Sequence, residues 1–132
     1  MRSVPEVSER FLPERALIDS YGNGGFRFAG MSHQGSLLIL ADGMHAWRPG
    51  RFADVGLADF ATVLSAGKQP AFLLFGTGAT MHLPSPHLMQ AFAEAGTALE
   101  AMTTGAAVRT YNILLAEKRD VAAALLAVEL AR

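Results

Sequence analysis

The residues best suited to chemistry fall in two segments, the first of which is a glycine loop. Gly76-Thr77-Gly78 follows an apolar run, and exposed amides in such a turn can cradle phosphate, as in dinucleotide-binding folds. The third glycine of that fingerprint would stand where the chain has Met81, and no P-loop lysine follows. A plain turn is therefore the favoured interpretation. Because ligands of open α/β sheets bind at the carboxyl ends of strands, the loop is also where a site would lie.

The second segment is a helix start. Thr103 or Thr104 can cap a helix over about residues 105–117. Arg109 and Asn112 would share one face of it, since they stand three apart. A positive charge near a helix start opposes the helix dipole, which indicates that Arg109 has a partner. An internal carboxylate is the favoured partner, and a ligand anion or another protein are the alternatives.

The two segments are expected to border one cleft. The strands that precede them would end at the same edge of a sheet if they run parallel. Helix-start amides and the Arg109 guanidinium would then favour an anion or a carboxylate. Tyr111 should instead pack in the core. The predicted ligand- or partner-binding residues are Gly76, Thr77, Gly78, Thr103, Thr104, Arg109 and Asn112.

Other reactive groups form no recognisable arrangement. The chain has no cysteine, which excludes thiol catalysis and Cys-based zinc sites. The spacing of the histidines does not match a helical metal pair, and these are His33, His45, His82 and His87. The acids are scattered, and no Gly-x-Ser-x-Gly elbow occurs. We predict no catalytic residues, no metal and no cofactor, and favour a protein that is not an enzyme.

Composition narrows the class of protein further. The chain has 132 residues and a net charge of -1, which argues against a nucleic-acid binder. No apolar stretch reaches the roughly 18 residues of a membrane span, and the first residues resemble no secretory signal. A cytoplasmic location is expected. Only 17% of residues are charged, below the roughly 25% of typical domains. The charge-poor stretch 52–98 is therefore either mostly buried or part of an apolar contact surface.

Periodicity predicts a single α/β domain over residues 16–132, preceded by a flexible arm over residues 1–15. The first half is a series of short strands and turns, with strands at 17–21, 26–28, 36–40 and 44–47 and a turn at 32–35. The second half alternates helices at 57–66, 86–95 and 105–117 with strands at 71–75 and 98–102. Residues 121–128 read equally well as a helix or a buried strand. This order argues for a sheet with at least one parallel pair.

Several motifs together resemble one family over about residues 15–128. They are Tyr21-Gly22-Asn23-Gly24-Gly25-Phe26-Arg27-Phe28, Gly35-Ser36, Trp47, Leu73-Leu74-Phe75-Gly76-Thr77-Gly78, Arg109-Thr110-Tyr111-Asn112 and Glu117-x-Arg119. The family is the domain of unknown function 498, or complex I assembly-factor-3-like family. The resemblance implies a three-layer α/β domain with a central mixed sheet, flanking helices and an additional β-hairpin region. It also implies a strand at 121–126, antiparallel to its neighbours.

The resemblance also suggests a function. Mitochondrial members help assemble respiratory complex I and bind another assembly factor, whereas this chain, which shows no transit peptide, looks like a bacterial member. The favoured hypothesis is a non-catalytic protein-binding or assembly factor, for a membrane respiratory complex. Its partner would be an assembly factor or a membrane-complex subunit, and a homo-oligomer stays open. The alternative is a small-molecule or anion-binding domain, or an enzyme, using the strand-end cleft near Gly76–Gly78 and Thr103–Arg109.

Overall fold

A six-stranded mixed sheet forms the centre of the computed structural model, which describes residues 10–131. The strands in spatial order are β1 (Arg10–Leu12), β6 (Gly43–Trp47), β5 (Ser36–Leu40), β9 (Val121–Leu125), β7 (Phe72–Gly76) and β8 (Ala98–Met102). β7 runs parallel to β8 and β9, whereas the pairs β9–β5, β5–β6 and β6–β1 are antiparallel. The predicted mixed sheet with a parallel pair is therefore confirmed.

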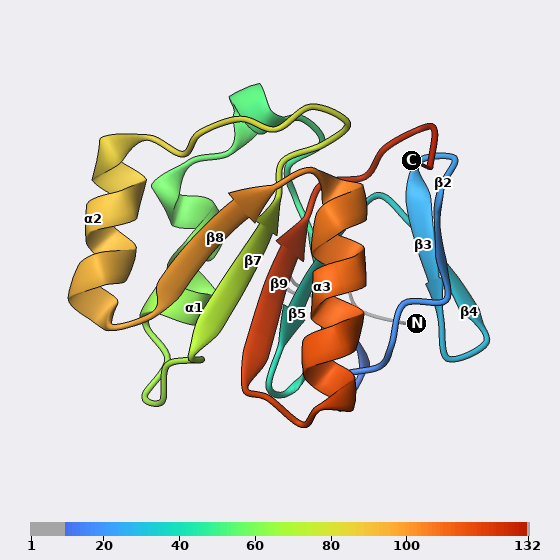
Figure 1. The fold of residues 1–132 in the computed structure, drawn as a ribbon, viewed down its shortest axis with the longest axis horizontal. Coiled ribbons are helices and arrows are strands. Elements are labelled where there is room, and N and C mark those ends of the chain that lie inside the picture. The colour runs from blue at the N-terminus through green and yellow to red at the C-terminus, as the bar shows by residue number, and fades with distance from the viewer. Residues whose placement is uncertain (1–9, 132) are drawn as a thin grey trace, which may run out of the picture.

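Layers on both faces of this sheet make the three-layer architecture (Figure 1). On one face lie α2 (Pro86–Ala95), the short α1 (Ala61–Leu64) and two 3₁₀ turns, η1 (Phe52–Asp54) and η2 (Leu57–Phe60). The other face carries α3 (Thr104–Ala116) and a three-stranded antiparallel sheet of β2 (Ser20–Gly22), β3 (Gly25–Phe28) and β4 (Met31–Gln34). This small sheet is the additional hairpin region that the family resemblance implied.

Alternating side chains of the buried strands build two cores. On β9, Val121, Ala123 and Leu125 pack toward α3 and the small sheet, whereas Ala122 and Ala124 pack toward α1 and α2. All five residues of β9 are buried, as expected of a strand covered on both faces. The strand interpretation of this segment is therefore confirmed over the helix that its alanines also favoured.

The orientation of β9 corrects part of the expectation. β9 is antiparallel to β5 but parallel to β7, so it is not antiparallel to both neighbours. The cause is the order β8–α3–β9, in which a helix returns the chain to the edge where β8 began. Such a crossover joins parallel strands, and β8 is itself parallel to β7.

Two predicted local elements also differ. The chain turns at Ala29 and Gly30, which both have positive φ, so the expected turn at 32–35 is largely strand β4. The expected helix at 57–66 splits at Phe60, whose φ of -108° and ψ of 11° leave the helical path. There the Asp59 carbonyl, which in a regular helix would accept an intrahelical hydrogen bond, accepts one from the indole N–H of Trp47.

The N-terminal segment is described only in part. Residues 1–9 of the arm expected over 1–15 lie outside the described residues. Arg10–Leu12 form strand β1, which pairs with β6 across a register shift. The sheet therefore reaches further toward the N-terminus than the predicted domain boundary.

Candidate functional site

The glycine loop lies where the sequence predicted, at the carboxyl end of the central strand β7. Gly78 has a φ of +109°, which side chains rarely adopt. Gly76 is required for a different reason, since a Cβ there would approach the Thr104 Cα to 3.0 Å. Gly78 therefore holds a conformation that is unfavourable for other residues, and Gly76 permits close approach of α3.

The start of α3 is hydrogen-bonded to this loop rather than separated from it by a cleft. The buried Thr104 hydroxyl accepts from the Gly78 N–H at 3.0 Å and donates to the Leu126 carbonyl at 2.7 Å. The Thr104 N–H donates to the Gly78 carbonyl at 2.9 Å. Thr103 caps the helix by accepting from the Ala106 N–H. Three amides that sequence reasoning offered to an anion are therefore used within the protein.

The remaining residues of the predicted set lie further along α3. Asn112 is engaged with the chain itself, because its amide group accepts from the Ile18 N–H at 2.8 Å and donates to the Ile18 carbonyl at 2.9 Å. Tyr111 is fully buried and donates to the Ala16 carbonyl, as its predicted core position requires. Burial raises the pKa of the Tyr111 phenol above its ordinary value. Arg109 is exposed on the helix surface.

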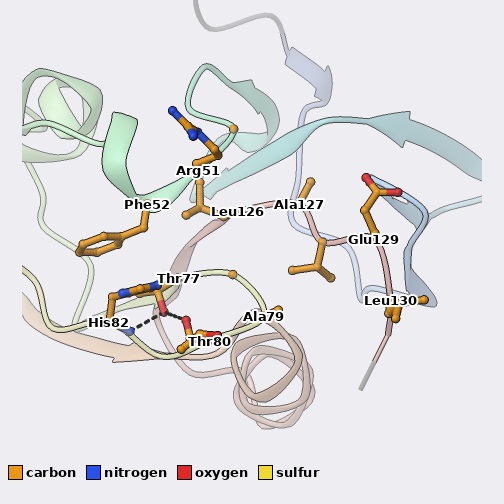
Figure 2. Close-up of a pocket in the computed structure, with 13 residues that line it drawn as sticks. Arg51, Phe52, Thr77, Ala79, Thr80, His82, Leu126, Ala127, Glu129 and Leu130 are labelled. Atoms are coloured by element: carbon orange, nitrogen blue, oxygen red, sulfur yellow. Dashed lines mark hydrogen bonds between the residues drawn. The ribbon is translucent and has the colours of Figure 1, made fainter.

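A cavity of about 430 Å³ opens beside the glycine loop (Figure 2). Thr77 and Gly78 line it, together with the segment that follows β9, whereas Thr103, Thr104, Arg109 and Asn112 do not. The structure thus brings the loop to a cavity but leaves the helix-start residues outside it.

Phe52 and His82, which the sequence did not indicate as site residues, form one wall of this cavity. The rings of Phe52 and His82 are stacked, with centroids 4.7 Å apart and planes 16° apart. The backbone N–H of His82 donates to the Thr77 hydroxyl, which in turn donates to the Thr80 carbonyl. These bonds fix the loop that carries His82. No motif joins Phe52 to His82, because their proximity depends on the path of the 3₁₀ turn η1.

Exposed apolar side chains gather around this wall, and we name them the apolar rim. A second cavity of about 280 Å³ shares Phe52 with the first and is lined by Leu57 and Leu83. Leu130 lines the first cavity, and Met81 stands between two of its lining residues. The rim comprises Leu57, Met81, Leu83 and Leu130, and Leu83 is 78% exposed. The charge-poor stretch 52–98 was expected to be either mostly buried or part of an apolar surface, and its residues Leu57, Met81 and Leu83 are exposed.

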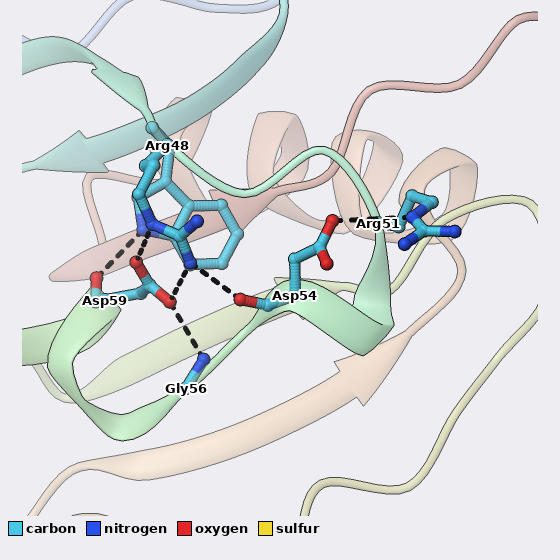
Figure 3. A network of polar contacts seen from close by, with 6 residues as sticks. Arg48, Arg51, Asp54, Gly56 and Asp59 are labelled. Carbon is cyan, nitrogen blue, oxygen red and sulfur yellow. Dashed lines mark hydrogen bonds and ion pairs between the residues drawn. The ribbon is translucent and has the colours of Figure 1, made fainter.

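An ion-pair network holds the segment that carries Phe52 (Figure 3). The Arg48 guanidinium donates to both oxygens of Asp59 at 2.8 Å and to the Asp54 carbonyl. The Gly56 N–H donates to Asp59 as well. The hydrogen bond from Arg48 is the main reason that the pKa of the Asp59 carboxyl lies below its ordinary value, and Asp59 raises the pKa of Arg48. The network is structural, since it fixes η1 and η2 against β6.

The remaining expectations concern metal-binding side chains, the histidines and membrane-spanning helices. Within residues 10–131, no group of three or more metal-binding side chains comes together. His33 is hydrogen-bonded to the Ser36 carbonyl and His45 to the Asp42 carboxylate, and His87 is the second residue of α2. No helix in the described part of the chain is both long enough and apolar enough to cross a membrane.

Comparisons with known proteins agree on one family. The family model described as "Protein of unknown function (DUF498/DUF598)" matches residues 18–126. An uncharacterized protein from Rhodobacter capsulatus is 43% identical over 111 residues, covering 83% of this chain and 82% of its own. NADH dehydrogenase (ubiquinone) 1 alpha subcomplex assembly factor 3 from Xenopus tropicalis is 27% identical over 118 residues, covering 89% of this chain. The match spans 64% of the Xenopus protein, which is less than two thirds of its length.

A solved structure supports the same fold. A protein from Bartonella henselae, described as an outer membrane protein, is 44% identical and superposes with a TM-score of 0.86. The match covers 90% of this chain and all of that one.

Proposed function

Because the chain belongs to the DUF498/DUF598 family of proteins of unknown function, we propose that it is a non-catalytic protein that binds another protein. The proposed setting is the assembly of a membrane respiratory complex, and the proposed partner is an assembly factor or a subunit of that complex. The name of the Xenopus relative supports this setting. The proposed location is cytoplasmic, and cell fractionation tests it against the location that the description of the Bartonella protein implies.

The apolar rim is the observation that carries the proposal. Leu83 projects from the loop between β7 and α2 with 78% of its surface exposed, beside a cavity that it lines together with Phe52. Apolar side chains gathered at one end of a domain mark a contact surface. The adjoining cavities offer places where a partner's apolar side chains can insert, as at the centre of protein interfaces.

A site-specific photo-crosslinker at position 83 tests the proposal in living cells. We expect a crosslinked protein species from position 83 and none from position 27, because Arg27 is exposed on β3 of the separate small sheet. Met81→Asp, on the same rim, should lower recovery of the species crosslinked from position 83 at least tenfold, while the free energy of unfolding changes by about 0.5 kcal/mol or less. Equal crosslinking from both positions would contradict the assignment of the rim.

The alternative is a small-molecule or anion-binding domain, or an enzyme, at the strand-end cleft. The cavity beside Thr77 and Gly78 favours it, since about 430 Å³ lies within the range of ligand sites. The bonds that occupy the amides of Gly78 and Thr104 argue against an anion at the helix start. Binding of a metabolite that is lost in Gly78→Val but kept in Leu83→Asp would favour this alternative.

A further inference from the structure

A cavity of about 450 Å³ lies at the opposite end of the sheet from the glycine loop. Residues at the amino ends of β7 and β9, at the end of β5 and on α1 line it. α1 has only four residues, so it covers little of the sheet at this end. Leu40, Val63 and Ala122 give the cavity apolar walls, and its volume lies in the range of small-molecule sites.

Both lysines of the chain, Lys68 and Lys118, line this cavity. Within the described residues, neither ammonium group has an ion-pair partner. Arg119 also lines the cavity, and its guanidinium lies 5.1 Å from the centre of the Phe72 ring. In a chain with 11 Lys and Arg residues in all, this is a local concentration of positive charge.

The carboxylates of the cavity do not neutralise these cations. Asp42 lies 2.7 Å from the ring of the buried His45. Asp120 lies 3.7 Å from Arg15, which also donates to the Val121 carbonyl. With Arg15 and Arg119 the cavity is lined by four basic residues and two acidic ones. Since both acids already have local partners, the remaining charge is positive.

The backbone at Lys118 adds a second observation. Lys118 has a φ of +60° immediately after α3, where its N–H and that of Arg119 bond the carbonyls of Leu115 and Leu114. Glycine is the residue that this helix ending favours. A lysine here is less favourable for the backbone, although its charge suits the helix dipole. The experiment must therefore separate ligand binding from helix stability.

We propose that this cavity binds a small organic anion with an apolar body, an aliphatic carboxylate being the simplest case. The apolar walls would bury the hydrocarbon part, and the ammonium groups of Lys68 and Lys118 would bind the carboxylate. Charge-assisted hydrogen bonds of this kind are stronger than neutral ones. The site is independent of the apolar rim, since it lies at the other end of the sheet.

Calorimetric titration with octanoate, octylammonium and inorganic phosphate tests the proposal. We expect octanoate to bind at least tenfold more tightly than the other two probes. Lys68→Met and Lys118→Gly should each weaken octanoate binding about tenfold, as loss of one charged hydrogen bond predicts. Arg27→Met removes the same charge from the exposed face of β3 and should leave binding unchanged.

Thermal melts of the same variants show whether a loss of binding reflects unfolding. Lys118→Gly should melt close to the parent protein, because glycine suits the positive φ. Octylammonium binding as tightly as octanoate would overturn the charge argument, and phosphate doing so would overturn the role of the apolar walls. Absence of octanoate binding, or binding unchanged in both lysine variants, would overturn the site itself.

Discussion

The two ends of the sheet differ in the kind of side chain that they expose to a partner or ligand. At the carboxyl end, the polar groups of the glycine loop and the α3 start bond one another, and the exposed side chains beside them are apolar. At the amino end, apolar side chains line a cavity, and the exposed charged side chains beside them include Lys68 and Lys118. One end therefore suits an apolar protein surface, and the other suits a small anion.

This difference qualifies a general rule about α/β sheets. Ligands usually bind at the carboxyl ends of the strands, where helix starts present free amides. Here the Thr104 hydroxyl closes that end by bonding Gly78 and Leu126. Topology therefore indicates where a site can lie. What the site can bind depends on the donors and acceptors there that are not already bonded within the protein.

Gly76→Ala should have the largest effect, because it breaks the close packing that distinguishes the carboxyl end. The new Cβ would lie 3.0 Å from the Thr104 Cα, which is backbone and cannot rotate away. We expect a loss of about 3 kcal/mol in the free energy of unfolding, as for severe overpacking. Urea unfolding measures it. Gly67→Ala is the matched control, since nothing lies near its Cβ and its φ is ordinary, and an equal loss in both variants would contradict the role of Gly76.

Thr104→Val should have the next largest effect and tests the polar closure of the same end. Valine keeps the shape but removes the hydroxyl, which leaves the Gly78 N–H and the Leu126 carbonyl without that partner. We expect a loss of about 2 kcal/mol, measured by urea unfolding. Thr110→Val on the middle of α3 is the control. If Thr104→Val binds phosphate at the released Gly78 N–H, the hydrogen bond of the Thr104 hydroxyl is what excludes an anion from the parent protein.

Sequence reasoning succeeded where a signal was local. The predicted helix at 86–95 and the buried strand at 71–75 follow from residues that stand next to one another, and Ser85 and Gly96 cap the two ends of that helix. It did not predict contacts that a distant segment decides, such as the hydrogen bonds between the Asn112 amide and Ile18. The contact of Phe52 with His82 is of the same kind. The cavity at the amino end is lined by residues from four separate segments of the chain, so no sequence motif indicates it.

Acid should act on the carboxyl end through the Arg48–Asp59 pair. The pKa of Asp59 lies below its ordinary value of 3.8 in the folded protein, mainly because of the hydrogen bond from Arg48. A carboxyl group with a lowered folded pKa stabilises the protein above its unfolded pKa, and that contribution is lost as the pH falls through the folded value. The parent protein should therefore lose more stability below about pH 4 than Asp59→Asn does. Parallel stability curves for the two proteins would contradict this assignment.

Arg109→Ala should have the smallest effect on stability and tests whether the two ends act separately. Arg109 is exposed on α3 and lines neither the cavity beside the glycine loop nor the one at the amino end. We expect the free energy of unfolding to change by about 0.5 kcal/mol or less, as for ordinary surface substitutions. If Arg109 contributes to a partner-binding surface, recovery of the species crosslinked from position 83 should fall more than stability does. Octanoate binding at the amino end should stay at the parent value, because that site uses other cations. A large loss of stability would mean that Arg109 is structural. A parallel loss of octanoate binding would mean that the two ends are coupled. The connection would be α3, which leads from the glycine loop toward Lys118.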